Sequence, residues 1–264
     1  MAAQRPVGLL PAAGRGTRFH HYRAPKELFP LLLRTASGGL MPTPISTFAL
    51  NAMKAAQAER CLVAISDGKS DVIRTLGDGS DVGVPLAYAH QCEPRGLTDV
   101  VRLARPWIQD RNVLFAMPDT IFFPEDALAQ LHARLLEDNA DVVAGVFLAA
   151  EPERLGVLEL DDHGEVIGMH DKPGHRKWPW CWGVLAWSPR FTHFCCEWEQ
   201  HRQAQRPTSE GILGHAMEAA RLGGLRLKAH RFPDGAFLDV GTPAGLATAV
   251  DALAKRGLLY GAPG

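Results

Sequence analysis

A glycine-rich segment near the amino end of the chain has the residue types that bind phosphate. The apolar run Val7–Leu10 leads into Pro11-Ala-Ala-Gly-Arg-Gly-Thr-Arg18, whose small residues let the backbone approach a ligand closely. Inward-pointing amide hydrogens, together with the cations Arg18 and Lys26, would attract an anion, and the phosphates of a nucleotide fit best. A tight turn between a strand and a helix can contain the same glycines, so this segment alone does not decide the function.

The first half of the chain predicts alternating strands and helices that would hold this segment in place. Strands are expected at Val7–Leu10, Arg60–Ser66, Pro85–His90, Val113–Met117 and Asp141–Phe147, and helices in the stretches that begin at Pro44, Lys69, Leu97 and Pro124. Such alternation implies parallel pairing, with helices on both faces of the sheet. Ligands of these sheets lie beyond the carboxyl ends of the strands, where the glycine-rich segment and Asp119 would meet.

The pattern changes in the second half of the chain. Further strands are expected at Gly156–Leu160, Glu165–His170, Trp180–Trp187 and Leu225–Phe232, and helices at Phe191–Gln205, Gly211–Arg221 and from Pro243 onward. The first two of these strands form a hairpin. We find no internal repeat, low-complexity segment or linker, and therefore expect one α/β domain over residues 1–264. It would have a mixed, mainly parallel sheet and a small antiparallel layer added by the second half.

Composition excludes several classes of protein. The 28 basic and 29 acidic side chains leave a net charge near zero, which argues against a nucleic-acid-binding protein. No stretch reaches the roughly 18 apolar residues of a membrane helix, and the amino end does not resemble a signal peptide. The five cysteines lack the C-x-x-C spacing of zinc sites and favour a reducing compartment, so we expect a cytoplasmic protein. They are Cys61, Cys92, Cys181 and the adjacent Cys195 and Cys196, which we expect to be buried in a helix.

A series of motifs extends in order along nearly the whole chain. They are Ala13-Gly-Arg-Gly-Thr-Arg18, Pro25-Lys-Glu-Leu-Phe-Pro30, Gln91 through Gly96-Leu97, Asp119, Gly156-Val-Leu-Glu159, Asp171-Lys-Pro173 and Phe237-Leu-Asp-Val-Gly-Thr-Pro243. Together they resemble the motifs of the sugar-1-phosphate nucleotidyltransferases, close to glucose-1-phosphate thymidylyltransferase and uridylyltransferase. The resemblance implies a three-layer, Rossmann-like fold of the nucleotide-diphospho-sugar transferase type, with an antiparallel layer that binds the sugar.

The resemblance also implies a reaction. A sugar 1-phosphate, with glucose 1-phosphate as the default, attacks the α-phosphorus of a nucleoside triphosphate, with dTTP or UTP favoured, and pyrophosphate leaves. Arg18 would hold the departing pyrophosphate, Lys26 the α-phosphoryl group and Lys172 the sugar phosphate. Asp119 and Asp239 would bind the cofactor Mg²⁺, a hard ion that takes carboxylate and phosphate oxygens. No general base is needed, because a phosphate dianion is already a nucleophile.

Two sets of binding residues follow from the same resemblance. Residues of the first half, about 1–150, would bind the nucleotide: Ala13, Gly14, Gly16, Thr17, Arg18, Gln91 and Gly96. Residues of the second half, about 151–264, would bind the sugar phosphate: Gly156, Glu159, Lys172 and Gly183. Relatives commonly form dimers or tetramers, so a homo-oligomer is possible, and neither a nucleic acid nor a membrane is expected as a partner.

The chain departs from the family pattern in four places. The segment between Arg18 and Lys26 is shorter than usual, and Met117-Pro-Asp119 keeps only the carboxylate of the family's G-D motif. Glu210 stands where relatives have a different helix start, and Trp178-Pro-Trp-Cys-Trp-Gly183 replaces smaller polar residues. The tryptophans suggest a smaller, more apolar or rearranged sugar pocket.

Three alternatives to a sugar-1-phosphate nucleotidyltransferase have their own sequence requirements. A catalytically silent nucleotide-sugar-binding regulatory protein would lose the charged residues that are retained here. A glycosyltransferase would need a D-x-D motif, which Met117-Pro-Asp119 lacks. A cytidylyltransferase for another phosphorylated alcohol remains the nearest rival within the enzymes.

Overall fold

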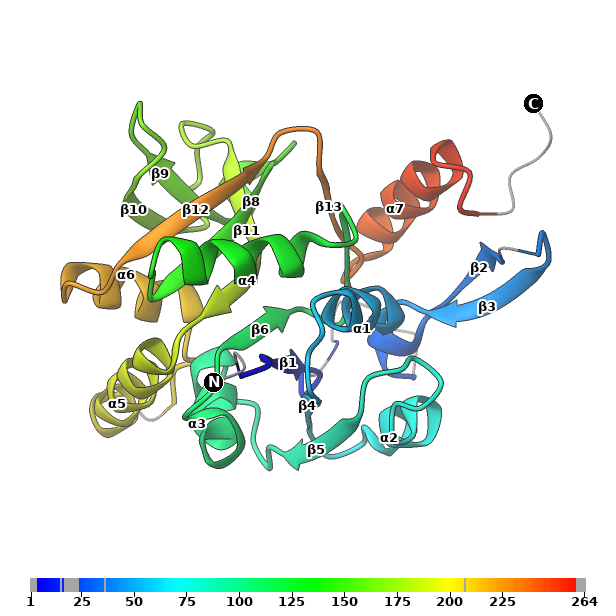
Figure 1. The fold of residues 1–264 in the computed structure, drawn as a ribbon, viewed down its shortest axis with the longest axis horizontal. Coiled ribbons are helices and arrows are strands. Elements are labelled where there is room, and N and C mark those ends of the chain that lie inside the picture. Colours follow the sequence, from blue (N-terminus) through cyan, green and yellow to red (C-terminus); the bar gives the residue numbers. More distant parts are fainter. Residues whose placement is uncertain (1–3, 15, 17–23, 36, 207, 260–264) are drawn as a thin grey trace.

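A mixed sheet extends through the molecule and carries strands from both halves of the chain (Figure 1). The computed structural model describes residues 4–14, 16, 24–35, 37–206 and 208–259. Within these residues the sheet has nine strands. One side of the sheet is parallel and consists of β6 (Val113–Ala116), β1 (Val7–Pro11), β4 (Cys61–Ile65) and β5 (Leu86–His90), with β5 at the edge.

The strands of the second half continue this sheet on the far side of β6. They are β8 (Val142–Leu148), β9 (Gly156–Leu160), β10 (Val166–Asp171), β11 (Trp180–Trp187) and β12 (Leu227–Phe232). Strand β11 is antiparallel to β6, β8 and β9, whereas β12 is parallel to β8. The predicted hairpin forms from β9 and β10 and joins the sheet through β11. The strand order across the sheet is β10-β9-β11-β6-β1-β4-β5, and β8 and β12 extend it from β11. The antiparallel part is therefore continuous with the parallel part.

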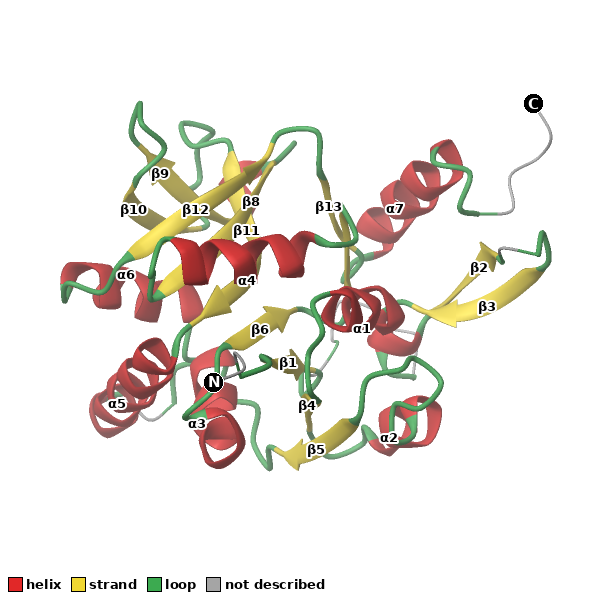
Figure 2. Cartoon of the chain, viewed as in Figure 1, coloured by secondary structure: helices red, strands yellow, loops and turns green. Residues whose placement is uncertain are grey.

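Helices cover both faces of the sheet, as the alternating pattern predicts (Figure 2). One face is covered by α1 (Ser46–Ala55), α2 (Ser70–Leu76) and α4 (Ala127–Glu137), and the other by α3 (Leu97–Ile108), α5 (Pro189–Gln205) and α6 (Leu213–Leu222). Successive strand residues point to opposite faces, so Leu9 and Leu10 enter different core clusters, and both are fully buried. Burial on both faces explains why β1 is a continuous apolar run.

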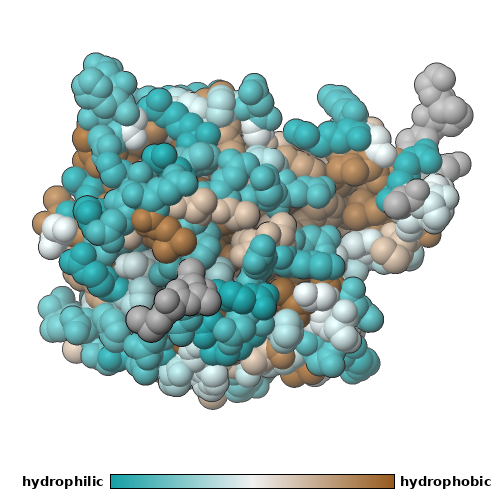
Figure 3. Space-filling view, viewed as in Figure 1, coloured by the Kyte–Doolittle hydropathy of each residue, from teal (hydrophilic) through white to brown (hydrophobic). Residues whose placement is uncertain are grey.

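Smaller elements lie beside the main sheet. They are the hairpin of β2 (Pro30–Arg34) and β3 (Leu40–Pro44), the antiparallel pair β7 (Thr120–Phe123) and β13 (Ala236–Asp239), the helix α7 (Pro243–Lys255), and the 3-10 turns η1 (Lys26–Leu28) and η2 (Pro152–Arg154). A third core cluster joins the hairpin, the β7–β13 pair and α7. In the space-filling view, hydrophobic side chains gather over α7, while most of this face is hydrophilic (Figure 3).

Most predicted elements are confirmed to within two residues, and the differences have local causes. The helix expected from Pro44 begins at Ser46, because Pro44 ends β3 and pairs with Pro30. The sequence does not predict strand β7, and the helix expected from Pro124 begins only at Ala127. Both β2 and β3 contain prolines, which disfavour a central strand but are tolerated in a two-stranded ribbon.

The cysteines lie as the sequence predicts. Cys195 and Cys196 are buried in α5, and none of the five cysteines of the described chain forms a disulfide. Burial raises the pKa of the Cys181 thiol to about 12 and that of Cys196 to about 11. Cys92 alone among the five is exposed. A membrane-spanning helix, which would have to be long and apolar, is not found in the described parts of the chain.

Candidate active site

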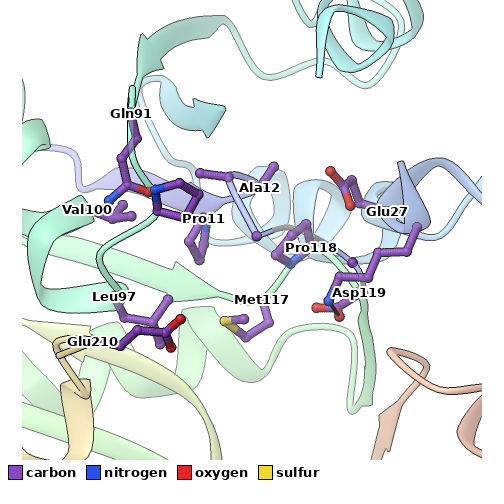
Figure 4. A pocket seen from close by; sticks show the side chains of 16 residues that line it. Pro11, Ala12, Glu27, Gln91, Leu97, Val100, Met117, Pro118, Asp119 and Glu210 are labelled. Carbon is purple, nitrogen blue, oxygen red and sulfur yellow. Dashed lines mark hydrogen bonds and ion pairs between the residues drawn. The ribbon is translucent and has the colours of Figure 1, made fainter. Parts of the chain in front are cut away.

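A cavity of about 520 Å³ opens at the carboxyl ends of β1 and β6 (Figure 4). Its wall is formed by the residues that follow β1, by Gln91 after β5, by the first turn of α3 and by Met117 to Asp119 after β6. This is the edge at which ligands of parallel sheets bind. The expectation that the glycine-rich segment and Asp119 share this edge is confirmed, since both line the cavity.

The described part of the glycine-rich segment forms one wall of the cavity. Ala13, Gly14 and Gly16 all line it. The Ser66 hydroxyl donates a hydrogen bond to the carbonyl oxygen of Ala13 at 2.8 Å, which fixes the start of the segment. Gly16 has a φ of +64°, a conformation that favours glycine. The predicted nucleotide ligands Thr17 and Arg18 lie outside the described residues, as does the segment 19–23.

A lysine and an aspartate face each other in the wall of the cavity. Lys26 begins η1, Asp119 follows β6, and the Lys26 ammonium contacts Asp119 Oδ2. Asp119 is only 3% exposed, so its charge needs a partner close by. The two residues that the sequence assigns to phosphate and to metal are therefore brought together as an ion pair.

The second predicted metal ligand, Asp239, is held beside Asp119 by strand pairing. Asp239 ends β13, which pairs with β7 so that Asp239 lies opposite Thr120, and the Val240 amide donates to the carbonyl oxygen of Asp119 at 3.0 Å. One carboxylate oxygen of Asp239 accepts a hydrogen bond from the Gly241 amide at 2.8 Å. The chain segments that carry Asp119 and Asp239 are therefore adjacent.

The donor set of these two residues fits Mg²⁺. The ion prefers carboxylate oxygens and usually keeps several water or phosphate ligands. No group of three or more histidine, cysteine, aspartate or glutamate side chains with a metal-binding arrangement occurs among the described residues. The protein would therefore supply two carboxylates, and phosphate or water oxygens would complete the coordination.

A buried carboxylate that the sequence analysis did not identify also lines the cavity. Glu27 is 1% exposed, and its Oε1 accepts a hydrogen bond from the Lys69 ammonium at 2.6 Å. Its other oxygen, Oε2, is buried and has no hydrogen-bond partner among the described residues. The sequence gives no local signal for this pair, because Lys69 comes from the stretch before α2 and reaches Glu27 only through the tertiary fold.

Gln91 lies at the end of the cavity away from Asp119 (Figure 4), and Gly96 also lines the cavity. Gly96 has a φ of +96° and forms an isolated β-bridge with Gly211. A side-chain carbon at Gly96 would lie 2.4 Å from the backbone nitrogen and oxygen of Gly211, so only glycine allows this approach. Glu210, which precedes Gly211, also lines the cavity.

The predicted sugar-phosphate residues do not line this cavity. A side-chain carbon at Gly156 would lie 2.3 Å from Nε1 of Trp182, and one at Gly183 would lie 2.2 Å from the ring of Phe237. Both glycines therefore make room for an aromatic side chain of the protein itself. The exposed Lys172 has a φ of +48°, and its amide donates to the carbonyl oxygen of Leu155.

Glu159 is the fourth predicted sugar-phosphate residue, and it is held by neighbouring side chains. Its carboxylate lies 3.2 Å from Nε2 of His170 and 3.7 Å from the Lys177 ammonium. The His170 ring stacks on Trp178 at a centroid distance of 3.6 Å. The hydrogen bond with His170 holds the pKa of Glu159 below its ordinary value. Trp178 of the tryptophan-rich segment thus packs against the histidine that contacts Glu159.

Comparisons with known proteins agree with the motifs. The chain is 29% identical over 177 residues to the glucose-1-phosphate thymidylyltransferase of Neisseria gonorrhoeae, which covers 66% of this chain and 58% of that protein. It is 27% identical over 173 residues to the enzyme of the same name from Streptomyces griseus, with 64% and 45% covered. The chain therefore spans about half the length of the curated relatives that it matches.

Solved structures share the fold at lower identity. A Bacillus anthracis protein in complex with sucrose superposes with a TM-score of 0.80 and 19% identity over 97% of both chains. A UDP-glucose pyrophosphorylase in complex with UDP-glucose gives a TM-score of 0.74 and 18% identity over 96% of this chain and all of the other. The family model described as nucleotidyl transferase matches residues 7–256. The chain belongs to the nucleotidyl transferase family.

Proposed function

We propose that the protein is a Mg²⁺-dependent sugar-1-phosphate nucleotidyltransferase. It joins a nucleoside triphosphate, with dTTP or UTP favoured, to a sugar 1-phosphate, with glucose 1-phosphate as the default, and releases pyrophosphate. The observation that supports this most is that the glycine-rich segment and the Lys26–Asp119 pair line one cavity with Gln91 and Gly96. Such a cavity can hold the phosphates of a nucleotide at one end and its base at the other.

The reaction brings two polyanions together, so charge neutralisation and positioning supply most of the catalysis. Lys26 would turn from Asp119 toward an oxygen of the α-phosphoryl group, where its charge offsets the negative charge of the transition state. Arg18 would hold the departing pyrophosphate. Mg²⁺ held by Asp119 and Asp239 would neutralise phosphate oxygens. The backbone amides of Gly14 and Gly16 would bind the remaining phosphate oxygens.

The second substrate would approach from the second half of the chain. We assign Gly156, Glu159, Lys172 and Gly183 to the sugar phosphate, so that residues of about 1–150 and about 151–264 act as two halves of one unit. Lys172 is exposed and would neutralise the phosphate of this substrate. A cytoplasmic location and a homo-oligomer remain predictions of the sequence.

A related candidate is a nucleotidyltransferase for a different phosphorylated alcohol, such as a cytidylyltransferase. It is favoured by the indole of Trp182, which occupies the space beside Gly156. A smaller alcohol phosphate would need less of that space than a hexose 1-phosphate.

The experiment that tests these proposals is pyrophosphate release across a grid of substrates. UTP, dTTP and CTP would each be combined with several sugar 1-phosphates and with small alcohol phosphates, with Mg²⁺ and with a chelator. We expect release with a sugar 1-phosphate, only when both substrates and Mg²⁺ are present. Release with a small alcohol phosphate but with none of the sugar 1-phosphates would favour the nucleotidyltransferase for a different phosphorylated alcohol. Silence across the grid, with a nucleotide sugar still bound, would indicate a regulatory protein.

A further inference from the structure

A buried carboxylate lies directly behind Gln91. Asp99, in the first turn of α3, is 3% exposed. Its Oδ2 accepts a hydrogen bond from the side-chain nitrogen Nε2 of Gln91 at 2.7 Å. Its Oδ1 accepts hydrogen bonds from the Arg102 guanidinium at 2.8 and 2.9 Å and from Nε2 of Gln203 at 2.9 Å. Asp99 does not line the 520 Å³ cavity, whereas Gln91 does.

This contact fixes which end of the Gln91 amide faces the cavity. A carboxylate can only accept hydrogen bonds, so the NH₂ group of Gln91 must face Asp99 and the carbonyl oxygen Oε1 must face away from it. In the described part of the chain, no protein donor bonds this oxygen. Apolar side chains of Pro11, Leu97 and Val100 flank the same end of the cavity (Figure 4). A flat, partly apolar ring with a polar edge fits such surroundings.

Asp99 is itself held rigidly, because its partners belong to a network that ties α3 to α5. Gln203 also donates to Oε1 of Glu199 at 2.8 Å. Glu199 is fully buried and accepts hydrogen bonds from Thr98 at 2.6 Å and from Arg202 at 2.6 and 2.7 Å. Rotation of Asp99 away from Gln91 would break several of these bonds. The orientation of the Gln91 amide is therefore set by the protein before any nucleotide binds.

We propose that Asp99 is a positioning residue that makes the site select a uracil or thymine base over cytosine. It holds Oε1 of Gln91 toward the cavity, where this oxygen accepts a hydrogen bond from the ring N3–H of uracil or thymine. The corresponding nitrogen of cytosine is itself an acceptor, so two acceptors would face each other without a proton between them. This inference rests on the proposed function, because it assigns the base of the nucleotide to this end of the cavity.

The variant Asp99→Asn tests the proposal. Asparagine has nearly the same shape, but its amide can offer either a donor or an acceptor, so Gln91 becomes free to turn its nitrogen toward the cavity. The wild type should prefer UTP or dTTP to CTP by about tenfold to a hundredfold in kcat/KM. In Asp99→Asn this ratio should fall by about tenfold, with CTP gaining. Dissociation constants for the same nucleotides, measured by calorimetry, should change in the same direction.

Gln203→Met is the matched control. It removes a hydrogen bond to Asp99 Oδ1 and loosens the same network, but it leaves the contact between Asp99 and Gln91 in place. Its base preference should equal that of the wild type, although its free energy of unfolding falls. Denaturant unfolding of both variants separates a general loss of stability from a change of selectivity.

Several results would overturn the inference. They are a wild-type preference for CTP, an unchanged ratio in a folded Asp99→Asn variant, and an equal shift in Gln203→Met. If Asp99→Asn does not fold, Gln91→Met gives the second test, because loss of the carbonyl oxygen should abolish the preference and its persistence would refute the inference. Absence of pyrophosphate release from the wild type would refute the proposed function instead, and the calorimetric ratios would still measure base preference.

Discussion

Removal of the Lys69 ammonium should destabilise the protein strongly, because it leaves a buried carboxylate without its charge partner. The Lys69 nitrogen lies 2.6 Å from Glu27 Oε1, and the two residues are 7% and 1% exposed. At an effective dielectric constant of about 20, the attraction over this distance is about 6 kcal/mol, part of which offsets the cost of burying both charges. Glu27 Oε2 already has no hydrogen-bond partner in the described chain, so no other donor among the described residues compensates for the loss.

We therefore expect Lys69→Met to lower the free energy of unfolding by about 3–5 kcal/mol. The double variant Glu27→Gln/Lys69→Met removes the carboxylate charge and should recover more than half of that loss. The measurement is denaturant unfolding at neutral pH, followed by tryptophan fluorescence. Lys228→Met is the control, since it breaks an exposed pair with Glu165 and should cost no more than about 1 kcal/mol.

A Lys69→Met variant that loses no more stability than Lys228→Met would refute this reasoning. So would a double variant that is no more stable than Lys69→Met. Either result would mean that the cavity wall beside Lys26 is not stabilised by a buried charge pair.

Three further predictions concern other residues of the described chain. Gly96→Ala should lower the free energy of unfolding by about 2–4 kcal/mol in the same denaturant assay. Gly224 has a similar positive φ but no neighbour within 4 Å, so Gly224→Ala should lower it by only about 1–2 kcal/mol. In the native protein an aromatic disulfide reagent should label one thiol, that of Cys92, because the other four cysteines are buried. The Cys92→Ser variant should therefore take up no label. Glu159 should titrate below its ordinary pKa of 4.5, so its contribution to stability is present above pH 4.5 and lost as the pH falls through the lowered pKa. His170→Phe should return that pKa toward 4.5 in a carboxyl NMR titration, and no change would contradict the assignment.

The strands and helices whose ends line the cavity could be predicted, because the residue pattern of each segment by itself indicates its secondary structure. Strands β1 and β4 are five-residue apolar runs buried along their whole length, and each is followed by small or polar residues. Helix α3 begins directly after Gly96, at the residue that the sequence predicts. Alternating strands and helices then require a parallel sheet, which brings the glycine-rich segment and Asp119 to one edge.

The partners of the site residues could not be predicted, because they depend on contacts between distant parts of the chain. Nothing in the order of residues near Glu27 indicates Lys69, and nothing near Asp99 indicates Gln203 on α5. The four-residue strand β7 is too short for a clear period-two signal, although its pairing with β13 brings Asp239 beside Asp119.

The side-chain packing of the second half also could not be predicted from the sequence. The tryptophans of the segment from 178 to 183 indicate a changed sugar pocket, but not which side chain each ring covers. The structure sets the indole of Trp182 against Gly156 and the ring of Trp178 against His170.

Lys26, Asp119 and the glycine-rich segment are proposed to form the centre of a nucleotidyl transfer site. The most direct test is pyrophosphate release by the wild type and by Asp119→Asn with the best substrate pair of the grid. Asp251→Asn, a change of the same chemistry on the exposed side of α7, serves as the control. Circular dichroism would establish that both variants are folded. We predict that Asp119→Asn lowers turnover by about two orders of magnitude or more, while Asp251→Asn does not change it. Turnover by a folded Asp119→Asn variant within a few-fold of the wild type would show that Asp119 is not part of a transfer site.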